Sequence, residues 1–339
     1  MSNDESLIAS VREIHIFLLP SELLHSGDEG QHCLNLLINL IPRFTGLKRL
    51  LYQVELSFAM GSLGLEESRW DHHSGILPSL LRTLPQYHPN CTLDVTLPYR
   101  QDLVSVLALL THSNCLHSLK TALDDDQRMA FKYLVGVTST CPNLKRLSIV
   151  LRTRNSFGPE YAIYHELKNL GSRSLQLEAL EVDGPLVLLK EHVGSTSADF
   201  LEWSALKELT LINPLNVVLL THLPMNLRVL RLRLDTVQDF STVQSISSLF
   251  RSLLANQRLE TLEIGGPPMM CQAITPEMLE PLGETLGCLK VHGNEDVAGL
   301  GTRSVYSLAD LERLGQTMGG LHTLGLDISI DEQWVCNVR

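Results

Sequence analysis

The sequence predicts an α/β fold built as a solenoid, a linear stack of strand-and-helix units. Two observations lead to this prediction: a leucine motif recurs along the chain, and apolar helical segments lie between its copies. The motif L-x-x-L-x-L is clearest at Leu206–Leu211 (LKELTL) and Leu227–Leu232 (LRVLRL). A sustained internal period is typical of a repeat protein, in which each unit buries its apolar face against its neighbours.

Eleven copies of this motif span most of the chain, which gives a mean period of about 31 residues between starts. The copies begin at residues 11, 47, 90, 116, 144, 177, 206, 227, 259, 286 and 321. L-x-x-L-x-L is the strand pattern of leucine-rich repeats. No linker or change of composition divides the chain. We therefore expect residues 1–339 to form one leucine-rich-repeat solenoid of about eleven irregular repeats.

The spacing also predicts how the solenoid is layered. Neighbouring strands lie about 4.8 Å apart and neighbouring helices about 10 Å apart, so a stack of such units must bend. We expect a curved, right-handed array with a parallel sheet on its concave face and helices on its convex face. Leucines at motif positions 1, 4 and 6 should point into the core, and positions 3 and 5 should point outward.

Apolar periodicity and capping residues predict the elements between the motif copies. A short helix should lead into a first strand near residues 11–17, and a polar loop should occupy residues 26–30. An irregular inserted loop is expected near residues 59–75, and a short or extended segment at 211–227. Thr275–Pro276 is a helix-start signal, as are Ser241–Thr242 and Asp125 or Asp126. Helices are expected at residues 33–41, 76–84, 102–111, 127–139, 161–170, 243–255, 276–285 and 307–318.

Composition narrows the class of partner and the compartment. The formal net charge is −11, from 27 basic and 38 acidic residues, which disfavours nucleic-acid binding because phosphate neutralisation needs clustered cations. The acidic start of the chain does not resemble a secretion signal, and no run of 18 apolar residues predicts a membrane span. Seven cysteines without C-x-x-C spacing favour reduced thiols. We expect a cytoplasmic or nuclear protein that is monomeric.

Charged and polar side chains at the outward positions define the candidate binding site on the concave face. These side chains could form cross-strand ion pairs on a solvated sheet, each contributing little. They could also form a mixed-charge patch that orients a protein partner and speeds its association. The candidate residues are Arg146, Glu181, Asp183, Glu208, Arg231, Arg233, Glu263, Lys290 and His292.

Motifs for catalysis, metals and cofactors do not have the required spacing. His72–His73 lacks a spaced third ligand, and the acidic run Asp124–Asp126 lacks the pattern of a calcium loop. Gly299–Gly301 is not followed by the rest of a dinucleotide-binding fingerprint, and there is no nucleophile elbow. The sequence therefore predicts a protein without enzymatic activity, metal or cofactor.

Three segments resemble the leucine-rich-repeat tails of F-box proteins, in particular the irregular fungal type. They are VREIHI at Val11–Ile16, HPNCTLDV at His88–Val95 and CPNLKRLSI at Cys141–Ile149. The resemblance implies similar repeats over about residues 7–330 and a role in substrate recognition beside a ubiquitin-ligase adaptor. Leu19–Leu24 (LPSELL) is similar to the opening of an F-box, but the polar residues 25–30 depart from it. The asparagine that regular repeats carry at position 9 is present in one copy, as Asn294.

The sequence as a whole predicts a non-enzymatic module that binds a protein on its concave face. The resemblance favours the substrate-recognition part of an F-box-like ubiquitin-ligase adaptor. One alternative is a free-standing sensor or inhibitor that sequesters a protein partner. Another is a GTPase activator built on similar repeats, in which an exposed arginine such as Arg231 or Arg146 would act as a finger.

Overall fold

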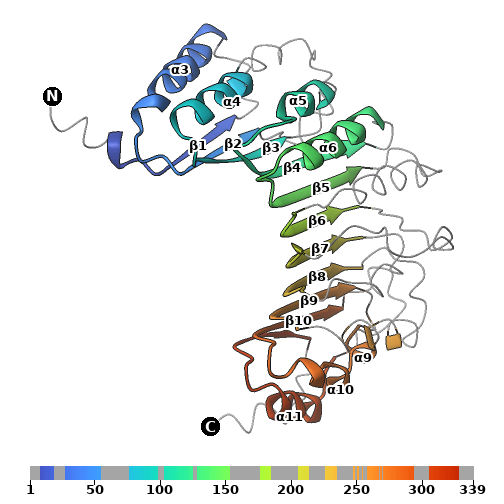
Figure 1. The fold of residues 1–339 in the computed structure, drawn as a ribbon. Coiled ribbons are helices and arrows are strands. Elements are labelled where there is room, and N and C mark those ends of the chain that lie inside the picture. Colours follow the sequence, from blue (N-terminus) through green and yellow to red (C-terminus); the bar gives the residue numbers. More distant parts are fainter. Residues whose placement is uncertain are drawn as a thin grey trace. The chain divides into compact units, whose positions relative to one another are not determined.

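A computed structural model of the chain describes most of its strands and helices (Figure 1). The described residues are 8–18, 27–54, 76–97, 103–124, 128–152, 176–184, 205–213, 226–234, 247–248, 250–251, 254, 258–266, 268, 270–293 and 305–327. The chain divides into two compact units. Unit 1 contains residues 1–154 and 166–177, and unit 2 contains residues 155–165 and 178–339.

Unit 1 contains five parallel strands with helices between them. The strands pair in sequence order, and helices α3 to α6 lie along one face of their sheet (Figure 1). The elements are β1 (Glu13–Leu18), α3 (Gly27–Leu40), η1 (Ile41–Arg43), β2 (Arg49–Val54), α4 (Ile76–Tyr87), β3 (Thr92–Leu97), α5 (Leu103–Leu110), β4 (Leu116–Asp124), α6 (Arg128–Thr140) and β5 (Arg146–Arg152).

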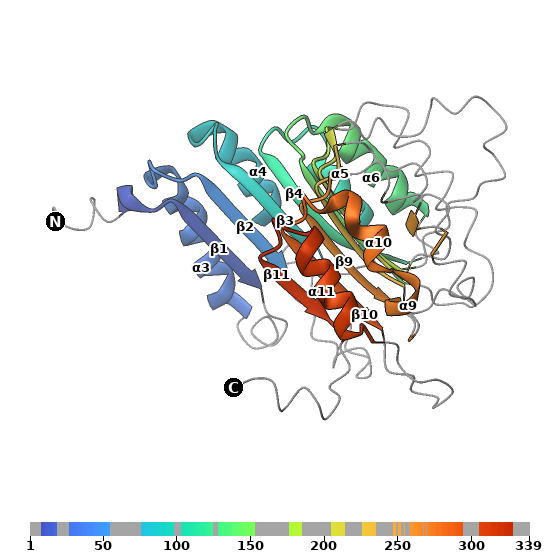
Figure 2. The same cartoon turned by 90° about the horizontal axis from the view of Figure 1, so that it is seen from below.

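Unit 2 contains six parallel strands, also paired in sequence order. Helix α9 packs against β10, and α10 packs against α11 (Figure 2). The elements are β6 (Ala179–Asp183), β7 (Glu208–Ile212), β8 (Val229–Arg233), β9 (Thr261–Gly266), α9 (Met270–Ala273), α10 (Pro276–Leu279), η7 (Glu280–Leu282), β10 (Cys288–Gly293), α11 (Leu308–Thr317) and β11 (Thr323–Leu326).

The α/β class and the parallel pairing of the strands are confirmed. All eleven predicted strands are present, and ten of them begin two residues after the start of a motif copy; β4 begins at its motif start, Leu116. The leucines at positions 1, 4 and 6 are buried in most copies, as Leu206, Leu209 and Leu211 show. Position-4 leucines are paired across neighbouring strands, for example Leu209 with Leu230. The outward positions on the same strands are half-exposed.

Backbone hydrogen bonds join the repeats at the amino-terminal edge of the strands. In unit 2 the carbonyl of each motif position 2 accepts two N–H groups from the next repeat. The carbonyl oxygen of Lys207, for example, accepts the N–H groups of Arg228 and Val229 at 2.8 and 2.9 Å. Glu178, Arg228, Glu260 and Gly287 accept in the same way. This ladder satisfies backbone donors that precede each strand and sets the register of the next one.

Helix boundaries differ from the prediction at two places. The predicted polar loop at residues 26–30 is wrong, because α3 begins at Gly27 and not at residue 33. Two glycines disfavour a helix only weakly, and the acidic pair Asp28–Glu29 suits a first turn. The predicted helix over residues 276–285 ends at Leu279 and continues as the 3-10 turn η7, which contains Pro281. A proline removes an N–H donor and so interrupts an α-helix.

Several other expected features lie outside the described residues or differ in detail. The loop at 59–75, the helix at 161–170, the cap signals at Ser241–Thr242 and Asp125 or Asp126, and most of 211–227 are not described. Thr275 does precede α10, but its side chain makes no capping bond. Helix α11 has a full capping box between Ser307 and Asp310.

Strands β4 and β11 depart from the predicted pattern. A bulge between Leu93 and Asp94 shifts the register by one residue. Leu93 pairs with Leu116 and Asp94 with Ser118, whereas the motif alignment had placed Lys120 beside Asp94. On β11, Leu324 occupies a predicted core position but is 50% exposed. The physical reason is that β11 is the last strand in the order and pairs, among described strands, with β10 alone.

We predict that Leu209→Ala lowers the free energy of unfolding by about 2–5 kcal/mol, because it removes a buried side chain and leaves a cavity. Leu209 is 4% exposed and is the second residue of β7. Urea unfolding followed by circular dichroism measures the change. Arg231→Ala, a half-exposed control on the next strand, should change it by less than about 1 kcal/mol. Equal effects of the two substitutions would contradict this assignment of the core.

We also predict opposite effects of alanine at two glycines. A Cβ at buried Gly283 would overlap the carbonyl oxygen of Thr317, a backbone atom that cannot swing away. Gly283→Ala should therefore destabilise the protein by about 1–3 kcal/mol. A Cβ at Gly315, inside α11, meets nothing within 4 Å. Gly315→Ala should stabilise by about 0.5–1 kcal/mol through helix propensity. Thermal unfolding of both variants tests the pair, and destabilisation by Gly315→Ala would refute it.

Candidate functional site

The predicted site residues all lie on strands, with exposed or half-exposed positions. Arg146, on β5 of unit 1, pairs in register with Ser118. The other eight belong to unit 2. They are Glu181 and Asp183 on β6, Glu208 on β7, Arg231 and Arg233 on β8, Glu263 on β9, and Lys290 and His292 on β10.

The strand register of unit 2 places the position-5 side chains in one row. Continuous pairing aligns Glu181, Thr210, Arg231, Glu263 and Lys290 on strands β6 to β10. Because neighbouring strands lie about 4.8 Å apart, adjacent members of this row are within reach of each other. The row lies on the sheet face opposite the buried leucines, since side chains alternate along a strand.

Glu263 is the centre of a charge network in this row. Its carboxylate lies 3.4 Å from Nε of Arg231 and 3.0 Å from Nζ of Lys290, on the two flanking strands. The hydrogen bond from Lys290 to Glu263 raises the pKa of that lysine. The predicted cross-strand ion pairs are therefore present on β8, β9 and β10. Glu181 is separated from Arg231 by the intervening Thr210, so these two are not adjacent in the row.

His292 belongs to a second cluster beside this network. Its Nδ1 lies 3.2 Å from Oδ1 of Asp327, and the backbone N–H of Gly293 donates to the other carboxylate oxygen at 2.7 Å. A Cβ at Gly325 would stand 3.1 Å from Cγ of Lys290 and 3.3 Å from Nε2 of His292. The missing side chain at Gly325 therefore leaves room for both polar side chains over β11.

A comparable network lies on unit 1, and the sequence did not single it out as a site. Arg49 on β2 lies 3.2 Å from Glu13 on β1 and 2.7 Å from Asp94 on β3. Asp94 also lies 3.3 Å from Nδ1 of His117. The hydrogen bond with Asp94 raises the pKa of Arg49. Arg49 and Asp94 occupy outward motif positions, so the sequence indicated that both side chains point away from the core. It did not indicate that they meet, because their pairing depends on the strand register.

Three cysteine thiols of unit 1 lie near the amino-terminal edge of the strands and are buried. Burial raises the pKa of each thiol, for Cys91 to about 12. The Sγ of Cys141 donates to the carbonyl oxygen of Leu110 at 3.1 Å. A buried thiol with a raised pKa is a poor nucleophile, so these cysteines act as small packing residues. The six cysteines in the described part of the chain form no disulfide with each other.

Within the described ranges, no three His, Cys, Asp or Glu side chains are grouped to hold a metal ion. His72–His73 falls outside those ranges. Of the helices that the structure describes, none combines the length and the apolar character that crossing a membrane requires. The expected absence of enzymatic activity, metal and cofactor stays a prediction.

Comparison with known proteins does not assign this chain to a family. No protein-family model matches the sequence, and no curated protein matches it.

We predict that Cys91 alkylates slowly in the folded protein. With a pKa of about 12, against 9.0 for an ordinary thiol, its thiolate fraction at pH 8 is lowered about a thousandfold. Iodoacetamide labelling followed by peptide mass spectrometry should show Cys33, which is exposed, modified first. Cys91 should react at a comparable rate only after unfolding in urea. Equal labelling of the two cysteines in the folded protein would contradict the burial of Cys91.

Proposed function

We propose that this chain is a leucine-rich-repeat solenoid that binds a protein partner on the strand face opposite its buried leucines. The observation that carries this proposal is the row of half-exposed side chains on unit 2, in which Glu263 joins Arg231 and Lys290 across three strands. On this view the strand face is the concave surface, and the helices form the convex one.

The repeat character supports the solenoid part of the proposal. The strands recur with the leucine motif and pair in sequence order within each unit. The doubly accepting carbonyls of Glu178, Lys207, Arg228, Glu260 and Gly287 repeat the same bonding from one unit of the motif to the next. Each repeat thus contacts its neighbours in an equivalent way, as expected in a quasi-one-dimensional array.

The arrangement of charge supports recognition of a protein. The row alternates in sign from Arg231 to Glu263 to Lys290, which suits a partner with a complementary pattern of charges. The mutual ion pairs also restrain these long side chains before binding, which reduces the conformational entropy lost when a partner docks. Isolated surface pairs of this kind contribute little to folding, about 0–1 kcal/mol each, so stability alone does not account for the row.

The resemblance to F-box repeat tails makes the substrate-recognition part of a ubiquitin-ligase adaptor the proposed setting. Strand β1 already pairs with β2 at Glu13–Leu18, so the repeat array begins before Leu19–Leu24. Leu19–Leu24 lies outside the described residues. Helix α3 runs through residues 27–30, where a break had been expected, and it packs against α4 of the repeat array. Binding to an adaptor is a proposal that rests on this resemblance.

The two other functions receive no specific support. An arginine finger must be delivered into the active site of a GTPase. Arg231 is instead paired with Glu263, and it would have to leave this carboxylate to act as one. A free-standing sensor or inhibitor would use the same strand face, so it differs from the adaptor only in the identity of the partner.

Charge reversal on the row tests the proposed face. The variant Arg231→Glu/Lys290→Glu places two carboxylates beside Glu263. It should therefore abolish the charge complementarity between the row and a bound protein partner. Affinity capture from a eukaryotic cell lysate, followed by quantitative mass spectrometry, should show at least one protein retained by the wild type and reduced about tenfold or more on the variant.

A matched control distinguishes an effect of the strand face from an effect of the net charge. Arg251→Glu/Arg313→Glu makes the same change in net charge on exposed arginines of unit 2, with Arg313 on helix α11. This control should retain the partner. The proposal fails if the strand-face variant captures the same proteins in the same amounts as the wild type, or if the control loses them equally.

A further inference from the structure

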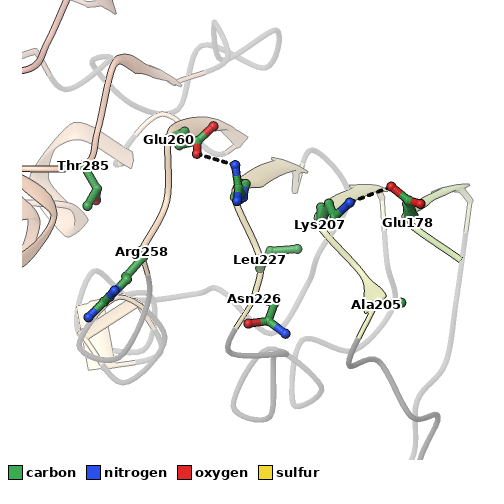
Figure 3. A pocket seen from close by; sticks show the side chains of 9 residues that line it. Glu178, Ala205, Lys207, Asn226, Leu227, Arg258, Glu260 and Thr285 are labelled. Atoms are coloured by element: carbon green, nitrogen blue, oxygen red, sulfur yellow. Dashed lines mark hydrogen bonds and ion pairs between the residues drawn. The ribbon is translucent and has the colours of Figure 1, made fainter. Parts of the chain in front are cut away.

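A separate surface lies at the amino-terminal edge of the strands of unit 2, away from the strand-face row. Here a hollow of about 560 Å³ opens to solvent (Figure 3). This volume is within the range of about 300–1,000 Å³ that is typical of ligand sites. The residues that line it are Glu178, Ala205, Lys207, Asn226, Leu227, Arg228, Arg258, Glu260 and Thr285.

The backbone ladder determines which side chains meet at this hollow. Glu178, Lys207, Arg228 and Glu260 all occupy motif position 2, and their carbonyls are held by successive repeats. Their side chains therefore project from four consecutive strands in one row, about 4.8 Å apart from strand to strand. The order of charge along the row is negative, positive, positive, negative. Two cations are thus neighbours in the middle of the row.

Each of the two central cations forms an ion pair with the carboxylate on its outer side in the row. Nζ of Lys207 lies 2.7 Å from Glu178, and Nη1 of Arg228 lies 3.1 Å from Glu260. In Figure 3 Lys207 reaches toward Glu178, and Leu227 lies between this pair and Glu260. Each cation keeps further N–H donors, because an ammonium has three and a guanidinium has five.

A third cation, Arg258, lines the same hollow. Among the described residues no carboxylate lies within ion-pair distance of it. The hollow therefore holds three cations and two carboxylates, whereas unit 2 as a whole is acidic. All of the chain's net charge of −11 belongs to unit 2, since unit 1 has equal numbers of acidic and basic residues. A locally cationic site in an acidic unit is the feature on which the following proposal rests.

We propose that this hollow docks an anionic segment of a peptide chain, with its carboxylate or phosphate oxygens between Lys207 and Arg228 and within reach of Arg258. A bound anion would relieve the repulsion between the two neighbouring cations and would accept charge-assisted hydrogen bonds from both. Carboxylates outside the hollow do not prevent this, because exposed charges beyond about 8 Å are largely screened at physiological ionic strength. The site is separate from the strand-face row, so this proposal does not depend on whether that row binds a protein.

Fluorescence anisotropy with the full chain tests this proposal. The probe is a fluorescein-labelled peptide of six glutamates, and a peptide of six lysines serves as the negative probe. The glutamate peptide should bind the wild type, with an affinity that falls as salt is raised. Lys207→Gln/Arg228→Gln should weaken binding about tenfold or more, since it removes two charged donors, and Arg258→Gln should weaken it less.

Arg251→Gln/Arg313→Gln is the matched control, because it removes two positive charges from exposed sites of unit 2 that do not line the hollow. It should bind the probe as the wild type does. Circular dichroism melting of every variant establishes that it is folded. Affinity of Lys207→Gln/Arg228→Gln within twofold of the wild type would overturn the proposal, as would an equal loss in the control.

Competition then identifies the anion. A phosphoserine peptide that displaces the probe more effectively than unlabelled glutamate peptide would assign the site to phosphate groups of a peptide. Displacement by the glutamate peptide alone would assign it to carboxylates, and either result supports the proposal. A labelled oligothymidylate that binds more tightly than both peptides, and is lost in Lys207→Gln/Arg228→Gln, would replace the peptide by a nucleic acid and overturn it.

Discussion

The structure depends on one repeated backbone interaction, the doubly accepting carbonyl at the amino-terminal edge of the strands. In unit 2 the carbonyl of one repeat binds two N–H groups of the next, at Glu178, Lys207, Arg228, Glu260 and Gly287. Backbone N–H groups need partners, and the two donors in each case belong to the residue before a strand and to the first residue of that strand. The bonds hold each new strand at a constant register, so the leucines at position 4 stack directly on one another.

Because the register is constant, residues at the same motif position lie side by side on neighbouring strands and form a continuous surface. Positions 3 and 5 of the motif are brought together on the face opposite the core, where Glu263 meets Arg231 and Lys290. Position 2 is brought together at the strand edge, where Lys207 and Arg228 become neighbours. Neither surface is continuous in the sequence, because each draws one residue from every repeat.

Some features of the array depend on residues that are not part of the leucine motif. Gly325 leaves space over β11 for Lys290 and His292, and Gly283 lets its backbone approach the carbonyl of Thr317. The Ser307–Asp310 capping box satisfies donors at the start of α11. Tyr306, fully buried beside this helix, donates its hydroxyl to the carbonyl of Ile274 at 2.6 Å. These contacts close the spaces that irregular repeats leave between helices and strands.

The sequence by itself determined the α/β class, the eleven strands and most of the described helices, because each follows from local periodicity and turn residues. It also identified the outward positions, including Glu263 and Lys290. Tertiary structure decided which outward residues meet. The bulge at Leu93 and Asp94 brings Asp94 to Ser118 and His117, and only the register reveals the row that joins Lys207 and Arg228. Pairing across strands depends on residues about 30 positions apart, which local patterns do not encode.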